Sequence, residues 1–341
     1  MFETLGFESL TPVLAAAILG LLVGCTFGAL AQRSGLCLRR GLAGPREERI
    51  PALGAWAMAM ATAIAGTRLA VITGLISFTD HRFLTPDLAI VALVVGGALF
   101  GAGMVMAGGC VSRLTVLAGS GNLRSLFALI IIAATAHATM KGALAPVRQV
   151  LGSLTIQGGE FVAITSLPGG EIWPFAVTAV AVIFALRSGA LKSHLLMAAV
   201  IGLLIPLSWV GTGFLLQDDF DPLPVESLGF TGPTAGALFW FVAATSIPVS
   251  FGTGLVAGVL AGSMAASTAS GEFRLQTLDV PTRTIRRLAG AVMMGIGGVL
   301  AGGCSVGAGL SGISTASLAA VLAFVAMSVT AKTLGKSLAD S

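Results

Sequence analysis

GAVMMGIGGVLAGGCSVGAGLSG, residues Gly290–Gly312, is the stretch that decides the fold. A near copy, GGALFGAGMVMAGGC, runs from Gly96 to Cys110, and a shift of 194 positions makes eight of its fifteen residues identical. Such identity indicates an internal repeat. Each copy predicts an apolar helix with a face of small residues, which lets another helix approach closely in a membrane. Each copy then reaches Ala-Gly-Gly-Cys, and two adjacent glycines are poor helix formers. The repeat therefore predicts two helix breaks within the membrane, at Cys110 and Cys304.

The composition is that of an integral membrane protein. The 341 residues are 55% hydrophobic and 10% charged, with a mean hydropathy of +0.96. Five runs carry no charge: Ser9–Gln32, Leu88–Ser112, Ser193–Gln217, Ser227–Gly271 and Leu288–Ala331. A membrane span needs about 20 apolar residues, so the last two runs each hold two passes. We expect one all-α membrane domain over residues 1–341, with no cleavable signal sequence at its start and no nucleic-acid partner.

Hydropathy predicts about nine transmembrane helices. They are expected at Leu10–Ala31, Pro51–Ile76, Leu88–Ala107, Leu123–Thr139, Ile172–Leu186, His194–Leu216, Ser250–Ala269, the second Gly-Gly-Cys helix and Ser317–Lys332. We expect Val111–Gly121 to be irregular re-entrant backbone and Thr234–Val249 to be a half-span. The loop after the first span carries four arginines between Arg39 and Arg49. By the positive-inside rule that loop is cytoplasmic. We therefore expect a protein of the inner (plasma) membrane with its N-terminus outside the cell and its C-terminus in the cytoplasm.

The chain divides into two halves with the same order of signals. Glycines at 20, 24 and 28 in the first span have counterparts at 254, 258 and 262, and each set precedes a Gly-Gly-Cys helix. We expect a first half-repeat over 10–145, connecting spans over 146–232 and a second half-repeat over 233–335. Broken helices at matching positions of two repeats point to a central transport site. Four re-entrant elements would meet there, and the repeats are either parallel or inverted.

Thiols and cations at the breaks indicate the chemistry. The cysteines form no CxxC pair, which disfavours a disulfide scaffold or a zinc site. Helix breaks present free N–H groups that favour anions, and thiols are weak donors and soft acceptors. The predicted relay residues are Cys37, Cys110 and Cys304, and the weaker candidates for substrate binding are Arg33, Arg113, Gly109, Gly303 and Ser305. The alternative for each thiol is a small buried hydrophobe, which suits Cys25 best. Arg68 is either functional or a residue that snorkels from a helix end.

Several motifs resemble one known family. They are Gln32-Arg33-Ser34-Gly35-Leu36-Cys37, Ala107-Gly108-Gly109-Cys110 with Ala118–Leu123, Gly271-Glu272-Phe273-Arg274, and Ala301–Gly307. In order and spacing they are similar to the YeeE/YedE family of sulfur-compound transporters, over nearly the whole chain. The resemblance implies an hourglass-like protein with nine membrane helices and four inward loops in a pseudo-222 arrangement. It also implies a thiosulfate ion passed along Cys37, Cys110 and Cys304 by S–H···S hydrogen bonds. Cys25 has no counterpart in that pattern.

The chain also departs from this family. Many members have Gly where this chain has Arg113, and Arg where it has Leu117, which leaves the sulfur substrate open. We expect uptake of a small sulfur oxyanion, thiosulfate first, by a protein that is not an enzyme and holds no cofactor. The alternatives are transport of sulfite, sulfide or a selenium species, a membrane sulfur-redox protein that forms persulfides, and a structural subunit. The resemblance also implies a cytoplasmic sulfur-carrier or rhodanese-like partner.

Overall fold

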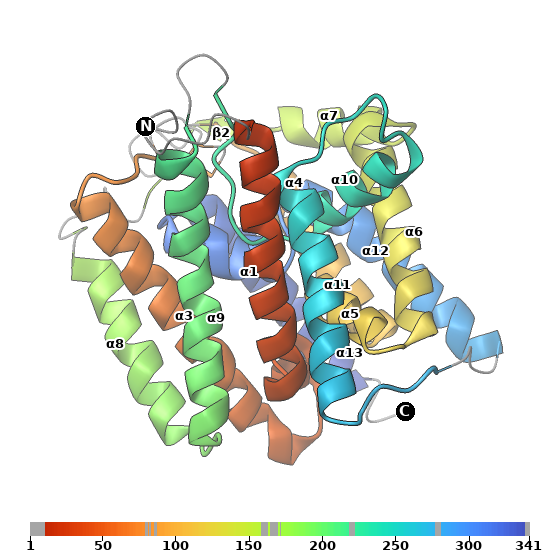
Figure 1. The fold of residues 1–341 in the computed structure, drawn as a ribbon, viewed down its shortest axis with the longest axis horizontal. Helices are drawn as coiled ribbons and strands as arrows, with labels where there is room; N and C mark the ends of the chain where they lie inside the picture. Colours follow the sequence, from red (N-terminus) through yellow and green to blue (C-terminus); the bar gives the residue numbers. More distant parts are fainter. Residues whose placement is uncertain are drawn as a thin grey trace.

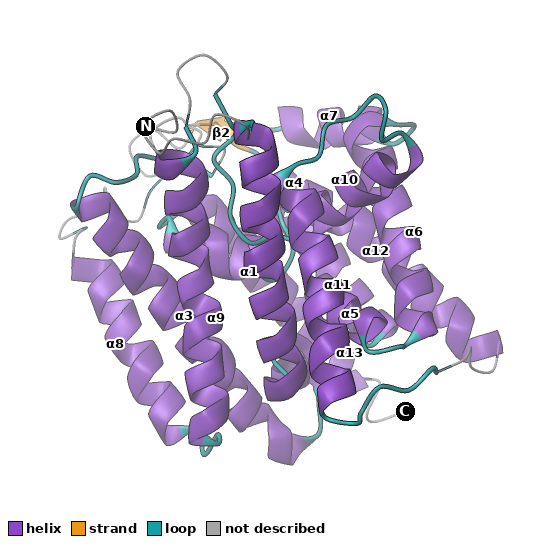
Figure 2. Cartoon of the chain, viewed as in Figure 1, coloured by secondary structure: helices purple, strands orange, loops and turns teal. Residues whose placement is uncertain are grey.

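A computed structural model describes residues 11–78, 81, 83–84, 87–157, 163, 170, 172–217, 222–276 and 281–337, without the side chains of 281–283. The described chain is almost entirely helical (Figures 1 and 2). Its only sheet, within this part of the chain, pairs Asp87–Leu88 with Ile156–Gln157.

The helices follow the predicted spans closely. In order, the elements are α1 Pro12–Ser34, α2 Leu38–Ala43, α3 Arg46–Ile72, β1 Asp87–Leu88, α4 Ile90–Ala107, α5 Val111–Gly119, α6 Leu123–Lys141, α7 Ala145–Ser153, β2 Ile156–Gln157, α8 Ile172–Arg187, α9 Lys192–Val210, η4 Gly211–Leu215, α10 Thr231–Val242, α11 Phe251–Ala269, α12 Pro281–Leu300, η5 Gly307–Gly312 and α13 Leu318–Ser337. Within the described residues, seven candidate spans are long and apolar enough to cross a membrane, and α8 is a shorter apolar helix. This confirms the all-α membrane class.

Two segments are more regular than the sequence suggested. We expected irregular backbone over Val111–Gly121, but Val111–Gly119 forms α5, and the chain turns only afterwards, at Gly121 with φ of 94°. The weakly patterned stretch after Leu144 contains α7 and β2. The glycines of Ala118-Gly-Ser-Gly end α5 and do not interrupt it.

Helices α1 and α11 run parallel in backbone contact. A Cβ on Gly24 would collide with the carbonyl oxygen of Leu255, and a Cβ on Gly258 would collide with that of Leu21. The contacts advance in the same direction along both helices, because Gly28 faces Val259. The two glycine series found in the sequence therefore pack against each other, as small-residue faces do in membranes.

The two Gly-Gly-Cys helices, α4 and α12, pack antiparallel. Gly96 near the start of α4 faces Ala301, whereas Gly103 further along faces Gly290. Helices α3 and α9 are parallel, since Gly202 faces Ala59 and Gly66 faces Pro206. Helix α13 packs on α4, and α6 packs on α12. The helix pairs around the centre thus combine parallel and antiparallel packing.

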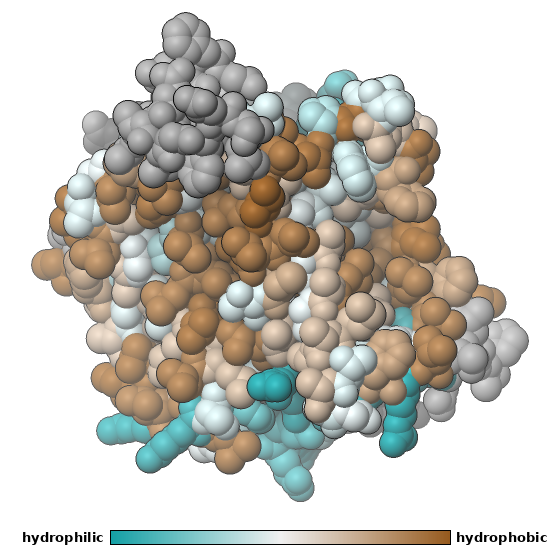
Figure 3. All heavy atoms as spheres, viewed as in Figure 1, coloured by the Kyte–Doolittle hydropathy of each residue, from teal (hydrophilic) through white to brown (hydrophobic). Residues whose placement is uncertain are grey.

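The two ends of the bundle differ in charge. Arg40, Arg46, Arg187 and Lys192 lie where α1, α8 and α11 finish and α3 and α9 begin. These helix ends lie at the lower end of the molecule in Figure 1, and hydrophilic residues gather along the same lower edge in Figure 3, below a surface that is mostly hydrophobic. We call this edge the basic end. The opposite end carries the β1–β2 pair and α7.

Candidate functional site

Three helix breaks share one backbone design. Helices α1, α4 and α12 are each followed by a glycine with positive φ: Gly35 at 62°, Gly108 at 88° and Gly302 at 71°. Residues with a side chain rarely adopt this conformation, so glycine favours a helix stop there. In every case a cysteine follows two residues later, and the next helical segment begins soon after it. The shared sequence Gly-x-Cys thus encodes a stop, a turn and a restart.

Each cysteine sits at the start of the following helical segment. Cys37 is the N-cap of α2 and Cys110 is the N-cap of α5, both in extended conformation. The sulfur of Cys304 accepts the backbone N–H of Gly307 at 3.3 Å. The sulfurs of Cys37 and Cys110 likewise lie beside the backbone N–H groups three residues further on, those of Arg40 and Arg113. The free N–H groups of a helix N-terminus carry partial positive charge, so each thiol lies where an anion is favoured.

The three breaks bring the three thiols together. The thiols of Cys37 and Cys110 interact with each other, and Cys304 is near enough to Cys110 for a charge on one to influence the other. Cys110 and Cys304 are fully buried, and Cys37 is 7% exposed. All are free thiols. Ser112 adds a hydroxyl whose Oγ lies 3.2 Å from the Cys110 sulfur.

Arginines flank the Cys37–Cys110 pair. The Arg113 guanidinium donates from Nη1 to the carbonyl oxygen of Ala31 at 3.2 Å, which ties α5 to α1, and its charge acts on both thiols. Arg40 holds the equivalent position after Cys37 and forms an ion pair with Glu48. Arg40 was not among the site residues predicted from the sequence. The spacing Cys-x-x-Arg, which occurs at both Cys37 and Cys110, is the signal that would have found it.

The remaining predicted residues lie at different distances from the thiols. Ser305 is fully buried, and its hydroxyl approaches Cys110 without another hydrogen bond in the described chain. A Cβ on Gly303 would lie 2.9 Å from the nitrogen of Ala308, so the turn has no room for a side chain, whereas a Cβ on Gly109 would make only ordinary contacts. Arg33 is exposed in the last turn of α1, and no contact with the thiols appears among the described residues.

The sequence left the roles of Cys25 and Arg68 open. The backbone of Cys25 packs against Gly258 and Gly262 of α11, which fits the packing alternative. Arg68 is buried within α3.

A cavity of about 220 Å³ opens beside Cys37. It is lined by Ser34, Gly35, Leu36, Cys37, Arg40, Glu47, Glu48, Pro51, Ala52, Ala55, Gly189, Ala190, Leu191 and His194. These residues come from α1, α2, α3 and the turn before α9, so the cavity lies at the basic end. We call it the inner vestibule. It connects the least buried of the three thiols with a polar, charged surface.

The segment that leads into α10 covers Cys304. Phe230 is fully buried, presents its backbone N–H to the Cys304 sulfur, and packs against Phe27 with ring centroids 5.1 Å apart. The preceding Leu228 carbonyl accepts the Ser311 hydroxyl at 2.6 Å. Cys304 is therefore closed off by this segment, whereas Cys37 borders the inner vestibule.

The arrangement suits a soft anion better than a metal ion. No group of three or more His, Cys, Asp or Glu side chains within the described ranges is placed to hold a metal. The site instead combines polarisable sulfur, hydroxyl groups, helix N-termini and guanidinium groups. Weak and repeated contacts of this kind allow an ion to enter and to leave.

Comparisons with known proteins identify the family. A family model described as sulphur transport matches residues 33–333. The thiosulfate transporter TsuA of Escherichia coli strain K12 is 29% identical over 323 residues, which cover 85% of this chain and 86% of that protein. The thiosulfate transporter TsuA of Spirochaeta thermophila is 27% identical over 326 residues, covering 90% and 94%. Because the family model spans most of its length, the chain belongs to the sulphur transport (YeeE/YedE) family and is a membrane transporter of sulfur compounds, not an enzyme.

Proposed function

We propose that this protein takes up thiosulfate and passes it inward along Cys304, Cys110 and Cys37 in that order. The observation that carries the proposal is the chain of neighbouring thiols that ends at the inner vestibule. Thiosulfate presents a terminal sulfur that is large and polarisable, which a thiol binds weakly as donor or acceptor. Two relatives that cover most of the chain are named as thiosulfate transporters, which supports this substrate.

The guanidinium groups of Arg113 and Arg40 supply the attraction for the anion in this proposal. Arg113 acts on both inner thiols, and Arg40 borders the vestibule that receives the ion. Arginine is suited to oxyanions because its planar fork donates two parallel hydrogen bonds. The equivalent position in the third break is Gly307, so the charge rises from Cys304 toward the basic end. A doubly charged ion is drawn inward by this gradient.

We propose nine membrane crossings with four inward segments, and a cytoplasmic basic end. The excess of Lys and Arg at that end supports the orientation by the positive-inside rule. The N-terminus then lies outside and the C-terminus inside a plasma (inner) membrane. The inward segments would be the restarts at α2, α5, α10 and η5, because each begins at a buried residue in the centre.

The two halves are proposed to be inverted repeats. Cys110 and Cys304 lie 194 positions apart, and Leu38 and Thr231, which begin α2 and α10, lie 193 apart. This near-constant spacing pairs α1–α6 with α9–α13. It differs from the division at 10–145, 146–232 and 233–335, because it places α9 in the second half. The antiparallel packing of α4 against α12 supports it, and so does the match between the parallel pairs α1–α11 and α9–α3.

The inner vestibule is a suitable place for a soluble partner to receive the ion. Its opening at the basic end and its Arg40, Glu47 and Glu48 side chains would face the cytoplasm. A sulfur-carrier or rhodanese-like protein, which holds sulfur on a cysteine, is the partner we propose. Binding of such a protein to inside-out vesicles, and its loss on Glu47→Lys, is the measurement that tests it.

Uptake of ³⁵S-labelled thiosulfate into proteoliposomes tests the function. We expect uptake by the native protein and competition by unlabelled thiosulfate that exceeds competition by sulfite, sulfide or selenite. Stronger competition by one of those ions would identify that ion as the preferred substrate. If instead Cys110 or Cys304 gained one sulfur atom while sulfite was released, the thiol would be accepting sulfur as a persulfide, and the proposed passage of an intact ion would be wrong.

A further inference from the structure

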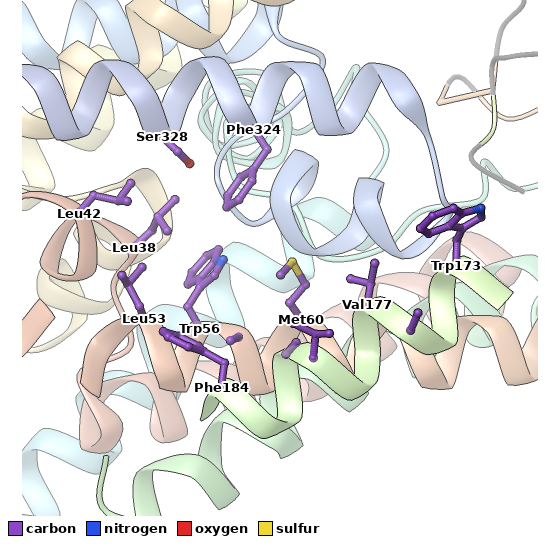
Figure 4. A pocket seen from close by; sticks show the side chains of 14 residues that line it. Leu38, Leu42, Leu53, Trp56, Met60, Trp173, Val177, Phe184, Phe324 and Ser328 are labelled. Atoms are coloured by element: carbon purple, nitrogen blue, oxygen red, sulfur yellow. The ribbon is translucent and has the colours of Figure 1, made fainter. Parts of the chain in front are cut away.

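A second cavity lies on the side of the bundle, and none of the three thiols lines it. It has a volume of about 520 Å³ and lies between α3, α8 and α13, with α2 at one end. We call it the side groove. Its lining residues are Leu38, Leu42, Leu53, Trp56, Ala57, Met60, Trp173, Ala176, Val177, Val180, Ala181, Phe184, Phe324 and Ser328. Figure 4 shows α13 along one wall and α8 with α3 along the other, with the labelled side chains pointing into the space between them.

The groove is apolar and about as long as one leaflet of a bilayer is deep. Ser328 is its one lining residue with a polar side-chain group besides the two tryptophans. On α8 it extends from Trp173 to Phe184, eleven residues, which corresponds to about 16 Å of helix. The hydrocarbon core of a bilayer is about 30 Å thick, so one leaflet spans roughly half of that. An extended acyl chain therefore matches the groove in polarity and in length.

Each lining helix carries a cation where the groove reaches the basic end. Arg49 lies four residues before Leu53 on α3, Arg187 lies three residues after Phe184 on α8, and Lys332 lies four after Ser328 on α13. Residues three or four apart share one face of a helix, so these cations continue the faces that line the groove. In the part of the chain that the structure describes, none of the three forms an ion pair, and Arg49 donates to the Gly44 carbonyl oxygen.

We propose that the side groove binds one acyl chain of an anionic phospholipid from the leaflet at the basic end, with the lipid phosphate held by Arg49, Arg187 and Lys332. A symmetric contact with a second copy of this chain fits the site less well. Such a contact places the same face of each copy together and brings the two sets of cations near each other. An anionic headgroup satisfies all three cations, and a membrane attracts such clusters through its anionic lipids.

A lipid in this groove would touch the element that carries the innermost thiol. Leu38, the first residue of α2, lines the groove and directly follows Cys37. Trp56 stacks on Phe324 across the groove, with ring centroids 6.5 Å apart and planes 6° apart. An acyl chain beside these rings steadies α2 against α3 and α13. The inference concerns the lipid alone and does not depend on which ion is transported.

Fluorescence quenching of Trp56 tests the proposal. Trp56 is only 4% exposed, so acyl chains of the bulk membrane reach it poorly, whereas a chain in the groove lies against it. The probe is the full chain with Trp173→Phe, Trp209→Phe and Trp240→Phe, in phosphatidylcholine vesicles that contain a small fraction of lipid brominated on its acyl chains. We expect brominated phosphatidylglycerol to quench at a concentration about tenfold lower than brominated phosphatidylcholine, since each cation near an anionic leaflet adds to the affinity.

The variants decide between the possible occupants. Joint replacement by Arg49→Gln, Arg187→Gln and Lys332→Gln should remove the preference for phosphatidylglycerol. Joint replacement by Arg274→Gln and Arg286→Gln, two exposed cations away from the groove, should leave it intact. Ala176→Phe fills the groove from an exposed position and should weaken quenching by both lipids. This variant tests the groove separately, in case the triple variant does not fold. Equal quenching by both lipids in the native background, an unchanged preference in the triple variant, or a stable dimer that excludes both lipids would overturn the proposal.

Discussion

The sulfur of Cys110 lies 3.2 Å from the hydroxyl oxygen of Ser112, and both side chains are buried. This hydroxyl can donate to the sulfur or accept from it, so it can hold the thiol in one orientation while an ion passes. A neutral hydrogen bond contributes about 1 kcal/mol, which corresponds to roughly fivefold in rate or affinity.

We therefore expect Ser112→Ala to lower thiosulfate uptake about fivefold, whereas Cys110→Ala should abolish it. The matched control is Ser120→Ala, which removes a hydroxyl from the end of the same helix, where it bonds to the Leu117 carbonyl. Its uptake should stay near the native value. Initial rates in proteoliposomes measure all three, and equal losses in Ser112→Ala and Ser120→Ala would assign the effect to α5 stability.

Arg113 should set the affinity for the anion. A hydrogen bond to a charged group contributes about 1.5–3 kcal/mol, so Arg113→Gln is expected to raise the KM of uptake by roughly 10- to 100-fold. Arg113→Lys keeps the charge without the planar fork and should be intermediate. Arg33→Gln is the comparison, because Arg33 is exposed at the end of α1. An Arg33 effect as large as that of Arg113 would contradict the placement of the charge.

Cys37 should be the most reactive thiol from the basic end, because it lines the inner vestibule and the other two relay thiols are fully buried. Variants that each keep one of the four cysteines, with the others changed to Ser, can be treated with a membrane-impermeant sulfonate thiol reagent. Oxidation and modification of a thiol follow its exposure. We expect rapid labelling of Cys37 in inside-out vesicles and slow labelling in right-side-out cells. The reverse pattern would place the basic end outside.

The Arg40–Glu48 ion pair should control the charge at the vestibule. Both side chains are 44% exposed, so the pair adds little to stability, but Glu48 offsets the attraction that Arg40 exerts on an anion. Glu48→Gln should speed labelling of Cys37 by a sulfonate reagent and slow labelling by a quaternary ammonium reagent. Glu47→Gln is the matched control, because Glu47 lines the same cavity and forms no ion pair in the described chain. Identical changes in both variants would show that the loss of any negative charge at the vestibule alters labelling, and that the ion pair has no special role.

The close packing of α1 on α11 should make Gly24 intolerant of a side chain. A Cβ there would meet the Leu255 carbonyl, and overpacking of this kind costs about 1–3 kcal/mol. Gly24→Ala should thus lower the midpoint of thermal unfolding in detergent. Gly236→Ala, within α10 where a Cβ meets no atom within 4 Å, should leave the midpoint unchanged or raise it, since Ala favours a helix over Gly. A lower unfolding midpoint in both variants would contradict the packing explanation.

Much of the fold was accessible from the sequence because hydropathy and glycine spacing report directly on membrane helices. The predicted span Ser250–Ala269 matches α11 to one residue at its start, and Ile172–Leu186 matches α8 to one residue at its end. Helix α5 was missed because it is only nine residues long, includes Ser112, Arg113 and Thr115, and ends next to glycines. Its regularity comes from burial against α6 and α11, which a local pattern does not reveal.

The candidate site was accessible only in part. The thiols were found because they repeat at matching breaks. The inner vestibule was not predicted, since it joins α2 with the start of α9, more than 150 positions later. The pairing of Arg40 with Glu48 was also missed. The sequence does not distinguish an arginine that only sets membrane orientation from one that borders a cavity. Packing between distant segments decides such roles.

A density map of the protein with bound thiosulfate tests the central claim most directly. The account predicts that the ion's terminal sulfur contacts the sulfur of Cys304 or Cys110, and that Cys110→Ala combined with Cys304→Ala removes this density while the helices remain in place. An ion bound elsewhere, with its terminal sulfur away from all three thiols and its density unchanged in the double variant, would contradict the account.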